Sequence, residues 1–436
     1  MKAVILAGGR GTRLAPLTDK IPKPMLPVGG KPILQHQIEC LQRYGVNEVF
    51  LTVGYGADAI RDFFGNGEKC AIKIHYVQEE IPLGTAGGLK ELEGRIAEDF
   101  FLIYGDLLFD VHLPDFYAFH LQKKGIATLF VHPNDHPRDS DLLAIDIDRQ
   151  LTAIFAKPHG RAYLPNLSNG ALYVLSPDIF QYLPASRKVD FMHDIFPELL
   201  RGGQRLYAYK SAEYVKDMGT RERLAKVNRD YDSGKPARLS KRAGRPAVFL
   251  DRDGTLIEEV DLLHKAEDLC LFPFAAEAVK KINESGLLAI LVTNQSVIAR
   301  NLCSTEQLQV IHNKMESLLA AEQGAFLDDI LYCPHHPHGG FPEENPAYKR
   351  QCSCRKPAIG LIEKAVALYN IDLSSSWMIG DTTVDIQTGK NAGLRTILVQ
   401  TGQRGQDKRY AVEPDFVFKN LLSSAEYIYN EQELAK

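Results

Sequence analysis

The sequence contains two apolar runs, far apart along the chain, that each end in a glycine-containing loop. The first is VILAGGRGTRL at residues 4–14, and the second is VFLDRDGTL at residues 248–256. A buried parallel strand reads as a continuous apolar run, and open α/β sheets bind their ligands at the carboxyl ends of such strands. Each run therefore predicts the first strand and the ligand loop of a separate α/β domain.

The length of the chain agrees with this division, because 436 residues suit two domains of roughly 200 residues better than one core. In both halves short apolar runs alternate with helical patterns, which predicts doubly wound parallel sheets. Strands are expected at residues 3–9, 48–55, 99–106 and 127–133, then at 247–251, 287–295, 377–381 and 395–400; helices are expected at 33–45, 275–285 and about 306–321.

Between the two halves, the segment DYDSGKPARLSKRAGRP is rich in Gly, Pro, Ser and basic residues and lacks apolar periodicity. Such a composition is typical of a solvated connector, although its basic run could also bind phosphate. The sequence therefore predicts a first domain at 1–230, a linker at 231–245 and a second domain at 246–436.

The bulk composition excludes some classes of partner. Hydrophobic residues make up 45% and charged residues 24% of the chain, and the net charge is −4. These values fit a globular protein and give no electrostatic reason to expect nucleic acid or an acidic membrane as partner. No apolar segment approaches the ~20 residues of a membrane span, and no signal-peptide pattern precedes the first strand. We expect a cytoplasmic protein.

In the first domain, the loop AGGRGTRL offers several unobstructed backbone N–H groups directly after a strand, with Arg13 to add positive charge. Such a nest suits phosphate, although a glycine-rich loop alone can equally be a tight turn. The continuation PLTDKIPKPMLPVGGKP places Lys23 in a proline-stiffened loop, where its ammonium can reach the same anion. Together these features favour a phosphate-binding loop.

The combined signature, G-G-x-G-T-R-L-x-P-L-T followed by P-K-P-M, resembles the sugar-nucleotide pyrophosphorylase family over about the first 230 residues. These Rossmann-like nucleotidyltransferases join a sugar 1-phosphate to a nucleoside triphosphate and release pyrophosphate. The resemblance implies a triphosphate site at Gly8, Gly9, Gly11, Thr12 and Arg13, with Lys23 against the leaving pyrophosphate. It further implies nucleoside contacts from Gln78, Gly84 and Thr85, magnesium ligands at Asp106 and Asp217, and sugar-phosphate contacts from Lys157, Asn169 and Gly170.

In the second domain, Asp251 and Asp253 lie two residues apart at the end of a strand, which by itself is also compatible with a solvated D-G turn. The further segments VTNQS, CRKP and IGDTTVD stand at suitable spacings downstream. Together these four motifs resemble the haloacid dehalogenase superfamily, which hydrolyses phosphate esters through an aspartyl-phosphate.

That resemblance implies a role for each motif. Asp251 would be the nucleophile, and Asp253 would protonate the leaving oxygen and then activate water. Thr293 and Lys356 would bind phosphoryl oxygens. Asp251, Asp381 and the Asp253 carbonyl would hold magnesium, and Asp385 would orient Lys356 or the metal shell.

Three of the seven cysteines crowd around histidines in the segment YCPHHPHGGFPEENPAYKRQCSCRKP. Cys333 and His335 form a C-x-H pair, and Cys352 and Cys354 form a C-x-C pair. Three thiolates and one imidazole make a closed tetrahedral zinc site, which predicts a structural staple for a loop with little core of its own. His336 and His338 remain alternatives to His335 as the fourth ligand.

The segments DRDGTL, TNQS, C-x-H and CxCRKP together resemble the D-glycero-D-manno-heptose 1,7-bisphosphate phosphatases, with the histidinol-phosphate phosphatases as near relatives. The match covers roughly residues 246–403. It implies that substrate is met by Asn294, Gln295, Arg300 and Arg355. The usual TNQSGIARG reads TNQSVIARN here, so that Val297 and Asn301 stand at two glycine positions.

The two resemblances describe consecutive reactions, because a heptose bisphosphatase produces a heptose 1-phosphate and a pyrophosphorylase consumes a sugar 1-phosphate. We therefore expect a bifunctional enzyme of nucleotide-activated heptose and surface-polysaccharide biosynthesis, with magnesium in both domains and zinc in the second. GTP is the favoured nucleotide by family resemblance. Two alternatives stay open: a hexose 1-phosphate transferase fused to a histidinol-phosphate-like phosphatase, and a chain with one non-catalytic regulatory half. The anomer, the oligomeric state and channelling between sites are also open.

Overall fold

The computed structural model describes residues 1–79, 81, 83–159, 163–185, 187–338 and 344–434. The chain divides into two compact units. The first comprises Met1–His132, Leu143–Ala156 and Asn169–Arg242, and the second comprises Pro133–Leu142, Lys157–Ser168 and Ala243–Lys436. The main change from the first unit to the second thus falls within the segment predicted as a linker.

The first unit is built on a sheet whose centre is parallel. β1 (Lys2–Leu6) pairs in parallel with β4 (Glu48–Val53) and with β6 (Phe100–Tyr104). β11 (Ser168–Leu175) runs antiparallel to β6, so the prediction of a purely parallel sheet is wrong for this unit. Between β6 and β11 the chain forms a helix and further strands, and it re-enters the sheet beside β6 in the opposite direction. The remaining strands of this sheet are β5 (Lys73–Gln78), β8 (Ala127–His132), β9 (Leu142–Ile145), β10 (Leu151–Phe155) and β12 (Leu206–Lys210).

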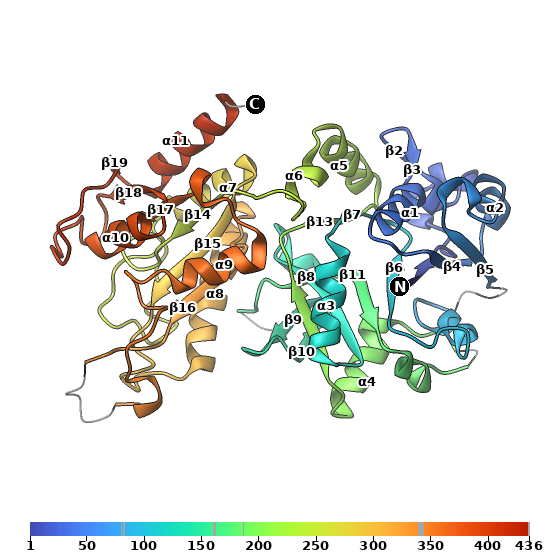
Figure 1. The fold of residues 1–436 in the computed structure, drawn as a ribbon, viewed down its shortest axis with the longest axis horizontal. Coiled ribbons are helices and arrows are strands. Elements are labelled where there is room, and N and C mark those ends of the chain that lie inside the picture. Colours follow the sequence, from blue (N-terminus) through green and yellow to red (C-terminus); the bar gives the residue numbers. More distant parts are fainter. Residues whose placement is uncertain (80, 82, 160–162, 186, 339–343, 435–436) are drawn as a thin grey trace. The chain divides into compact units, whose positions relative to one another are not determined.

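Helices cover this sheet because their apolar residues recur at helical spacing. In α1 (Ile33–Arg43), Leu34, Ile38 and Leu41 are fully buried in the same core cluster as Ile5 of β1. The strand-and-helix alternation of this unit can be followed from blue to green in Figure 1. Its other elements are α2 (Ala57–Phe64), α3 (Leu113–Lys123), α4 (Phe196–Arg201), α5 (Arg221–Asp232), α6 (Lys235–Leu239), and the short strands β2 (Pro27–Val28), β3 (Lys31–Pro32), β7 (Leu107–Asp110) and β13 (Tyr214–Asp217).

The segment predicted as a linker is more ordered than its composition indicates. α5 extends to Asp232, and α6 follows after a glycine that takes a left-handed conformation. Pro236 of α6 is buried, and Leu239 packs against an apolar cluster of the first unit that includes Tyr214. Local packing therefore holds part of this basic segment.

The second unit contains a six-stranded sheet in which every pair is parallel. Strand order is β16-β15-β14-β17-β18-β19, so β14 lies inside the sheet and not at an edge. The strands are β14 (Ala247–Leu250), β15 (Leu288–Asn294), β16 (Asp329–Cys333), β17 (Trp377–Gly380), β18 (Arg395–Val399) and β19 (Phe416–Phe418). The predicted strands of this half are confirmed.

Helices accompany this sheet, as the yellow-to-red part of Figure 1 shows. The predicted helix at 275–285 is confirmed as α7 (Ala275–Ser285), and the one near 306–321 as α8 (Thr305–Gln323). The others are α9 (Gly360–Tyr369), α10 (Thr383–Asn391) and α11 (Leu421–Leu434). All four residues of β14 are buried, which explains its continuous apolar sequence. Among the described helices, none combines the length and the apolar character that crossing a membrane requires.

Candidate active sites

The first candidate site lies where two neighbouring strands of the second sheet end. Asp251 directly follows β14, and Asp381 directly follows β17. The Asp251 backbone N–H donates to the Ile379 carbonyl oxygen at 3.0 Å, which continues the strand pairing up to the aspartate. Gly254, at a φ of 72°, completes the turn, and a Cβ there would collide with the Asp381 carboxylate. The D-x-D-G sequence thus brings both carboxylates to one sheet edge.

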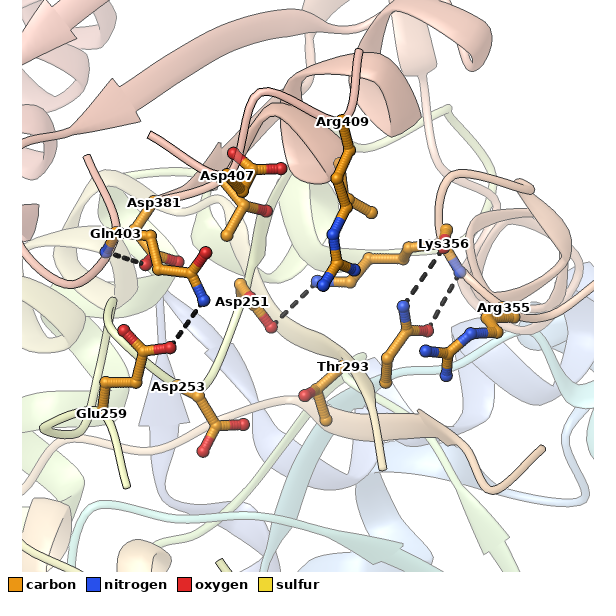
Figure 2. A pocket seen from close by; sticks show the side chains of 13 residues that line it. Asp251, Asp253, Glu259, Thr293, Arg355, Lys356, Asp381, Gln403, Asp407 and Arg409 are labelled. Carbon is orange, nitrogen blue, oxygen red and sulfur yellow. Dashed lines mark hydrogen bonds and ion pairs between the residues drawn. The ribbon is translucent and has the colours of Figure 1, made fainter. Parts of the chain in front are cut away.

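Lys356 connects the carboxylates of this site. Its Nζ lies 2.8 Å from Asp251 Oδ1 and 2.6 Å from Asp385 Oδ1, and the side chain is almost fully buried. Burial disfavours the charged lysine, but the two carboxylates outweigh it and raise the pKa of Lys356. The ammonium is therefore held in place as a permanent positive charge, within 2.8 Å of the predicted nucleophile (Figure 2).

One lysine does not balance the acidic groups. Burial and the charge of Asp385 raise the pKa of Asp251 to about 7, and burial and the charge of Asp251 raise the pKa of Asp381 to about 8. Asp381 Oδ2 accepts a hydrogen bond from the Gln403 N–H at 2.7 Å, whereas its buried Oδ1 has no partner in the described part of the chain. Oxygens of Asp251, Asp381 and Asp385 lie within 4.8 Å of one another. This donor set fits a hard divalent cation.

Asp253 is held from two sides. Arg252 donates from Nε and Nη2 to its carboxylate at 3.1 and 2.9 Å, and Gln295 donates from Nε2 at 3.0 Å. Gln295 Nε2 also lies 2.9 Å from Thr293 Oγ1. Gln295, predicted as a substrate contact, is buried and joins the two predicted catalytic residues. The buried Arg252 was not predicted, because only the fold turns its side chain back onto Asp253.

A pocket of about 190 Å³ opens over these groups. It is lined by Asp251, Asp253, Glu259, Thr293, Asn294, Arg355, Lys356, Asp381, Thr382, Val384, Gln403, Asp407 and Arg409. Of the residues that the sequence predicted for catalysis, Asp251, Asp253, Thr293 and Lys356 all reach it. The loop after β18 contributes three further residues that the sequence did not predict, although its run of Gly, Lys and Arg after a strand was a signal.

A second pocket of about 550 Å³ shares part of this lining, including Asn294, Arg355 and Arg409. It adds Arg350 and His338, so its wall is rich in cationic and imidazole groups. Arg355 Nη1 donates to the His335 carbonyl oxygen at 3.1 Å. Burial and then the charges of the neighbouring arginines lower the pKa of Arg355, with sulfur atoms of the cysteine cluster opposing the shift. Crowded guanidinium groups beside a catalytic pocket are suited to a second anion.

Of the four substrate contacts predicted for this unit, two line the pockets and two do not. Asn294 and Arg355 line both pockets, whereas Gln295 and Arg300 are not among the residues that line them. Asn294 exchanges hydrogen bonds with the Lys356 backbone at 3.1 and 3.0 Å and so fixes the lysine loop. Asn301 has a φ of 55°, a left-handed conformation in which asparagine is the usual replacement for glycine.

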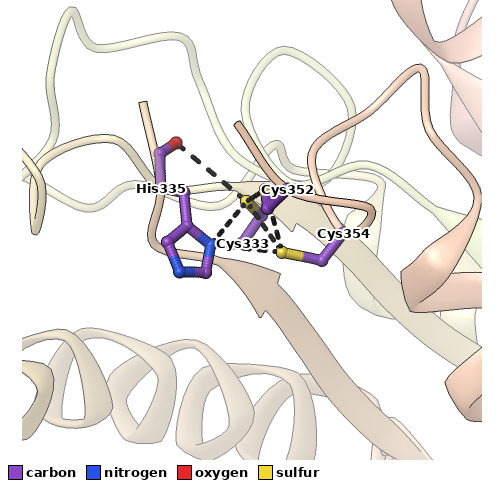
Figure 3. A group of neighbouring side chains, drawn as sticks. All are labelled: Cys333, His335, Cys352 and Cys354. Carbon is purple, nitrogen blue, oxygen red and sulfur yellow. Dashed lines mark hydrogen bonds between the residues drawn. The ribbon is translucent and has the colours of Figure 1, made fainter. Parts of the chain in front are cut away.

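The cysteines and His335 meet at one point (Figure 3). Cys333 Sγ lies 3.5 Å from Cys352 Sγ and 3.2 Å from Cys354 Sγ, and His335 Nδ1 lies 3.3 Å from Cys354 Sγ. A tetrahedral zinc ion with sulfur ligands at 2.3 Å requires separations of about 3.8 Å, so the cluster fits zinc after small adjustments.

Electrostatics favour a cation at this cluster. Hydrogen bonding with the Cys333 and Cys352 thiols lowers the pKa of Cys354 to about 5, which makes it a thiolate at neutral pH. The alternatives His336 and His338 instead contact each other, with His336 Nδ1 3.2 Å from the His338 carbonyl oxygen. His335 is therefore the imidazole that the fold brings to the three thiols.

The second candidate site lies in the first unit, at the carboxyl ends of β1, β4 and β6. It is a pocket of about 370 Å³. The Thr18 hydroxyl donates to the Gly11 carbonyl oxygen at 2.9 Å and closes the glycine loop, and Lys23 forms an ion pair with Asp106. The lining includes Gly8, Gly9, Gly11, Thr12, Arg13, Lys23, Glu79, Gly84, Thr85, Asp106, Lys188 and Gly219.

A small sheet brings the backbones of the two predicted magnesium ligands close together; Asp106 lines the pocket, whereas Asp217 is not among the described residues of its lining. β13 pairs with β7, which places Asp217 opposite Leu107, the residue after Asp106. Burial opposes ionisation of Asp217, but Arg223, at 2.8 and 2.9 Å, lowers its pKa. The two carboxylates are suitable ligands for magnesium, and each is paired with a cationic side chain here.

Other residues predicted for this site lie outside its lining. The alternation along β5 turns Gln78 outward, where it accepts a hydrogen bond from Arg61 at 2.8 Å, and the next residue, Glu79, lines the pocket instead. Lys157 Nζ donates to the Asp139 carbonyl oxygen at 2.8 Å, and the Asn169 amide donates to the Tyr173 hydroxyl at 2.8 Å. Gly170 packs close to Phe130.

Two family models match the chain. The nucleotidyl transferase model matches residues 2–234, and the HAD-hydrolase-like model matches residues 353–424. The first match covers more than half of the chain and contains the whole glycine loop. The second begins within the C-x-C-R-K-P segment and contains Lys356 and Asp381.

Individual relatives repeat the two-part pattern. The D-glycero-D-manno-heptose-1,7-bisphosphate 7-phosphatase of Thermosynechococcus vestitus is 40% identical over 190 residues, which are 42% of this chain and 95% of that protein. The mannose-1-phosphate guanylyltransferase of Mycobacterium tuberculosis is 33% identical over 234 residues, which are 53% of this chain and 65% of that protein. The structure of HddC from Yersinia pseudotuberculosis covers 53% of this chain and 99% of its own, with 30% identity and a TM-score of 0.46.

Proposed function

This chain belongs to the nucleotidyl transferase family and to the family of the heptose-1,7-bisphosphate 7-phosphatases, and on that premise we propose that it is a bifunctional enzyme of nucleotide-activated heptose synthesis. The second unit removes the C7 phosphate of D-glycero-D-manno-heptose 1,7-bisphosphate. The first unit then transfers a nucleotidyl group to the C1 phosphate of the product. We place both reactions in the cytoplasm, where nucleoside triphosphates and reduced thiols are available.

One observation carries the bisphosphate assignment. The pocket over Asp251 shares Asn294, Arg355 and Arg409 with the larger cationic pocket beside it. A phosphate at Asp251 would therefore belong to a molecule whose other end meets guanidinium groups. A sugar with phosphates at both ends fits this distribution of charge, and removal of one phosphate leaves the sugar 1-phosphate that the first unit requires.

The phosphatase chemistry follows from the fixed charges. Asp251 attacks the C7 phosphorus, the bond from phosphorus to the sugar oxygen breaks, and Asp253 gives its proton to that oxygen. Asp253 then takes a proton from water, which attacks the aspartyl-phosphate and releases phosphate. Lys356 and Thr293 hold the phosphoryl oxygens. Asp251 and Asp381 would hold magnesium, which would supply the remaining charge neutralisation. Cys333, His335, Cys352 and Cys354 would hold zinc, which would fix the loop that carries Arg350.

Nucleotidyl transfer depends mainly on alignment and charge. A C1-phosphate oxygen of the sugar attacks the α-phosphorus, and the bond to the β-phosphate breaks to release pyrophosphate. The backbone of the loop at Gly8, Gly9 and Gly11 holds the triphosphate, and Arg13 and Lys23 neutralise the leaving pyrophosphate. Asp106 and Asp217 would hold the magnesium of this unit, which requires the lysine and arginine paired with them to turn to the substrate anions.

GTP is the nucleotide we assign. The 33% identical relative is named as a guanylyltransferase, and this chain spans 65% of its length. That likeness supports a guanine nucleotide, and the sugar named for the relative is a mannose phosphate. Phosphatase relatives are named for the heptose, so the heptose 1-phosphate is the substrate that links both units.

The test incubates the purified full-length protein with heptose 1,7-bisphosphate, magnesium and each nucleoside triphosphate in turn. Phosphate and pyrophosphate are followed together. We expect pyrophosphate only after phosphate has appeared and only with GTP. Equal rates with every nucleotide would contradict the GTP assignment, and a faster reaction with hexose 1-phosphates or histidinol phosphate would replace the heptose substrates.

Two variants separate the reactions. D251N should abolish phosphate release and leave pyrophosphate release from supplied heptose 1-phosphate unchanged. D106A should do the reverse. Loss of both activities in either folded variant would contradict the model of two independent sites.

A further inference from the structure

Glu79 and Asp106 are the acidic residues among the described residues that line the pocket of the first unit, and Asp106 is paired with Lys23. Glu79 directly follows β5, and its backbone N–H donates to the Val53 carbonyl oxygen at 2.8 Å, which fixes its position at the sheet edge. Its side chain lines the pocket together with the glycine loop, Lys23 and Arg13. Unlike Asp106, which is paired with Lys23, this carboxylate has no cationic partner among the described residues, so repulsion between anions disfavours a position against the triphosphate.

The pocket is shaped around this carboxylate. A Cβ on Gly8 would lie only 2.5 Å from Glu79 Oε2, and a Cβ on Gly88 would collide with Glu79 Oε1. Two positions without side chains therefore make room for the two oxygens. The arrangement holds the carboxylate in one orientation at the wall of the pocket.

Neither side-chain oxygen of Glu79 has a partner among the residues that the structure describes. Within the part of the chain that the structure describes, no hydrogen bond or ion pair reaches the side chain. Burial, followed by the charge of Glu91, raises the pKa of Glu79, so that ionisation without a ligand is disfavoured. Two unpaired acceptor oxygens in a partly buried position call for a ligand that donates hydrogen bonds.

The position of Glu79 in the sheet indicates whether it lies near the phosphates or near the base of a bound nucleotide. Lys23 pairs with Asp106 at the end of β6, on one side of β1, whereas Glu79 follows β5, two strands away on the other side. Strands are spaced by about 4.8 Å, so these groups lie on opposite flanks of the glycine loop. With the phosphates near Lys23, the base lies toward Glu79.

Only one common base matches two adjacent acceptors. Guanine presents N1–H and the N2 amine side by side, and the two oxygens of one carboxylate can accept both. Adenine and cytosine each place a ring acceptor beside the amine, and uracil and thymine place carbonyl oxygens on both sides of their single N–H. Each of these bases would turn an acceptor toward a carboxylate oxygen.

We infer that Glu79 is the specificity-determining residue of the nucleotidyltransferase site and selects GTP by accepting both hydrogen bonds from the guanine edge. The inference rests on the proposed function and deepens it. It replaces Gln78, the sequence-predicted nucleoside contact, with the neighbouring carboxylate.

The experiment compares GTP with inosine triphosphate, which differs only in lacking the N2 amine. The full-length enzyme and supplied heptose 1-phosphate are used, and kcat/KM for pyrophosphate release is measured. A hydrogen bond to a charged group predicts that the wild type prefers GTP over ITP by about tenfold or more. In E79Q the amide places a donor against guanine, so kcat/KM with GTP should fall about 100-fold and the GTP-to-ITP ratio should approach one.

E91Q is the matched control, because it removes the neighbouring exposed acid in the same way and should keep both the rate and the ratio. Circular dichroism together with the pyrophosphate that E79Q still releases from ITP reports that the first unit is folded. An unchanged GTP-to-ITP ratio in E79Q would overturn the inference, as would a wild type that prefers another base.

Measurements with 2′-deoxy-GTP distinguish recognition of the base by Glu79 from binding of the ribose by Glu79. If E79Q removed discrimination against the deoxynucleotide and kept discrimination against ITP, Glu79 would bind the sugar and the inference would fail. No pyrophosphate from the wild type with any nucleotide and heptose 1-phosphate would instead contradict the proposed function.

Discussion

The two candidate sites hold their charges in different ways. In the second unit, Lys356 is nearly fully buried and paired with Asp251 and Asp385, and one oxygen of Asp381 has no partner among the described residues. In the first unit, Lys23 and Asp106 are partly exposed and already paired. The phosphatase centre is therefore preassembled around one fixed lysine but keeps an excess of negative charge, whereas in the nucleotide pocket each paired group must exchange its partner when substrate arrives.

This difference follows from what each reaction must neutralise. A carboxylate that attacks an anionic phosphate needs fixed positive charge around it before substrate binds. A nucleotidyltransferase brings two anionic substrates together in a wide pocket, so its lysine and arginine can turn from protein carboxylates to substrate phosphates. Stability and activity should consequently be coupled more tightly in the second unit.

The same substitution in the two units tests this coupling most strongly. K356M should lower the phosphatase rate by about 10³-fold or more and destabilise the second unit by about 3 to 5 kcal/mol, because it leaves buried carboxylates without their cation. K23M should abolish pyrophosphate release with little loss of stability. Trp377, the single tryptophan, is buried in the second sheet and reports the unfolding of that unit by fluorescence.

Equal losses of stability in K356M and K23M would contradict the tighter coupling of stability and activity in the second unit. K364M, which changes an exposed lysine of α9, is the control for the substitution itself and should behave as the wild type does.

Substitution in the cysteine cluster tests whether the second unit depends on a structural zinc ion. C354S should release one equivalent of zinc, measured by metal analysis, and lower the phosphatase rate by about tenfold or more, since ligand loss weakens a closed site. The rate of nucleotidyl transfer should be unaffected. C270S changes an exposed cysteine outside the cluster and should retain its zinc. Full metal content in C354S would show that these thiols do not bind it.

Substitution of Arg409 tests whether the cationic pocket binds the second phosphate of the substrate. R409A should raise KM for heptose 1,7-bisphosphate by about tenfold, the value of a charge-assisted hydrogen bond, because Arg409 lines both adjoining pockets. Hydrolysis of heptose 7-phosphate, which has no second phosphate, should change much less. K408A alters the adjacent basic residue as a control. Equal losses with both substrates would place Arg409 at the reacting phosphate instead.

The last prediction concerns the change of the free energy of unfolding with pH in the presence of a chelator. The pKa values of Asp251 and Asp381, about 7 and about 8, lie above those of the unfolded chain, so the folded state holds protons that the unfolded state releases. The free energy of unfolding should therefore fall as pH rises from about 4 to 8, by up to about 1.4 kcal/mol per pH unit for each proton.

Magnesium should remove much of this decline, because it replaces the protons. In D381N one of the two titrating groups is absent, so the slope in chelator should be shallower. Trp377 fluorescence in urea gives the free energy of unfolding at each pH. A stability that rises with pH across this range would contradict the assignment.

Local sequence was informative wherever one strand and its loop carry a site. The loop at residues 248–256 predicted the strand, the glycine turn and the two aspartates, and the pairs C-x-H and C-x-C predicted the cluster of three thiols and one imidazole. Contacts between distant segments were not predictable in this way. Arg409 reaches the pocket from the loop after β18, and the position of Gln78 depended on which way the last residues of β5 face, since a shift of one residue reverses the side.

By itself the sequence determined that the chain holds two α/β units and which reactions they resemble, because apolar strands, glycine loops and paired ligands are local patterns. Only the tertiary structure decided which residues share a site. It placed His335, and not His336 or His338, beside the three thiols. It also gathered arginines at the pocket beside Asp251 and turned Glu79, in place of Gln78, into the pocket of the first unit. Burial and side-chain direction depend on packing between segments that lie far apart in the chain, and the residues on either side of a position do not specify them.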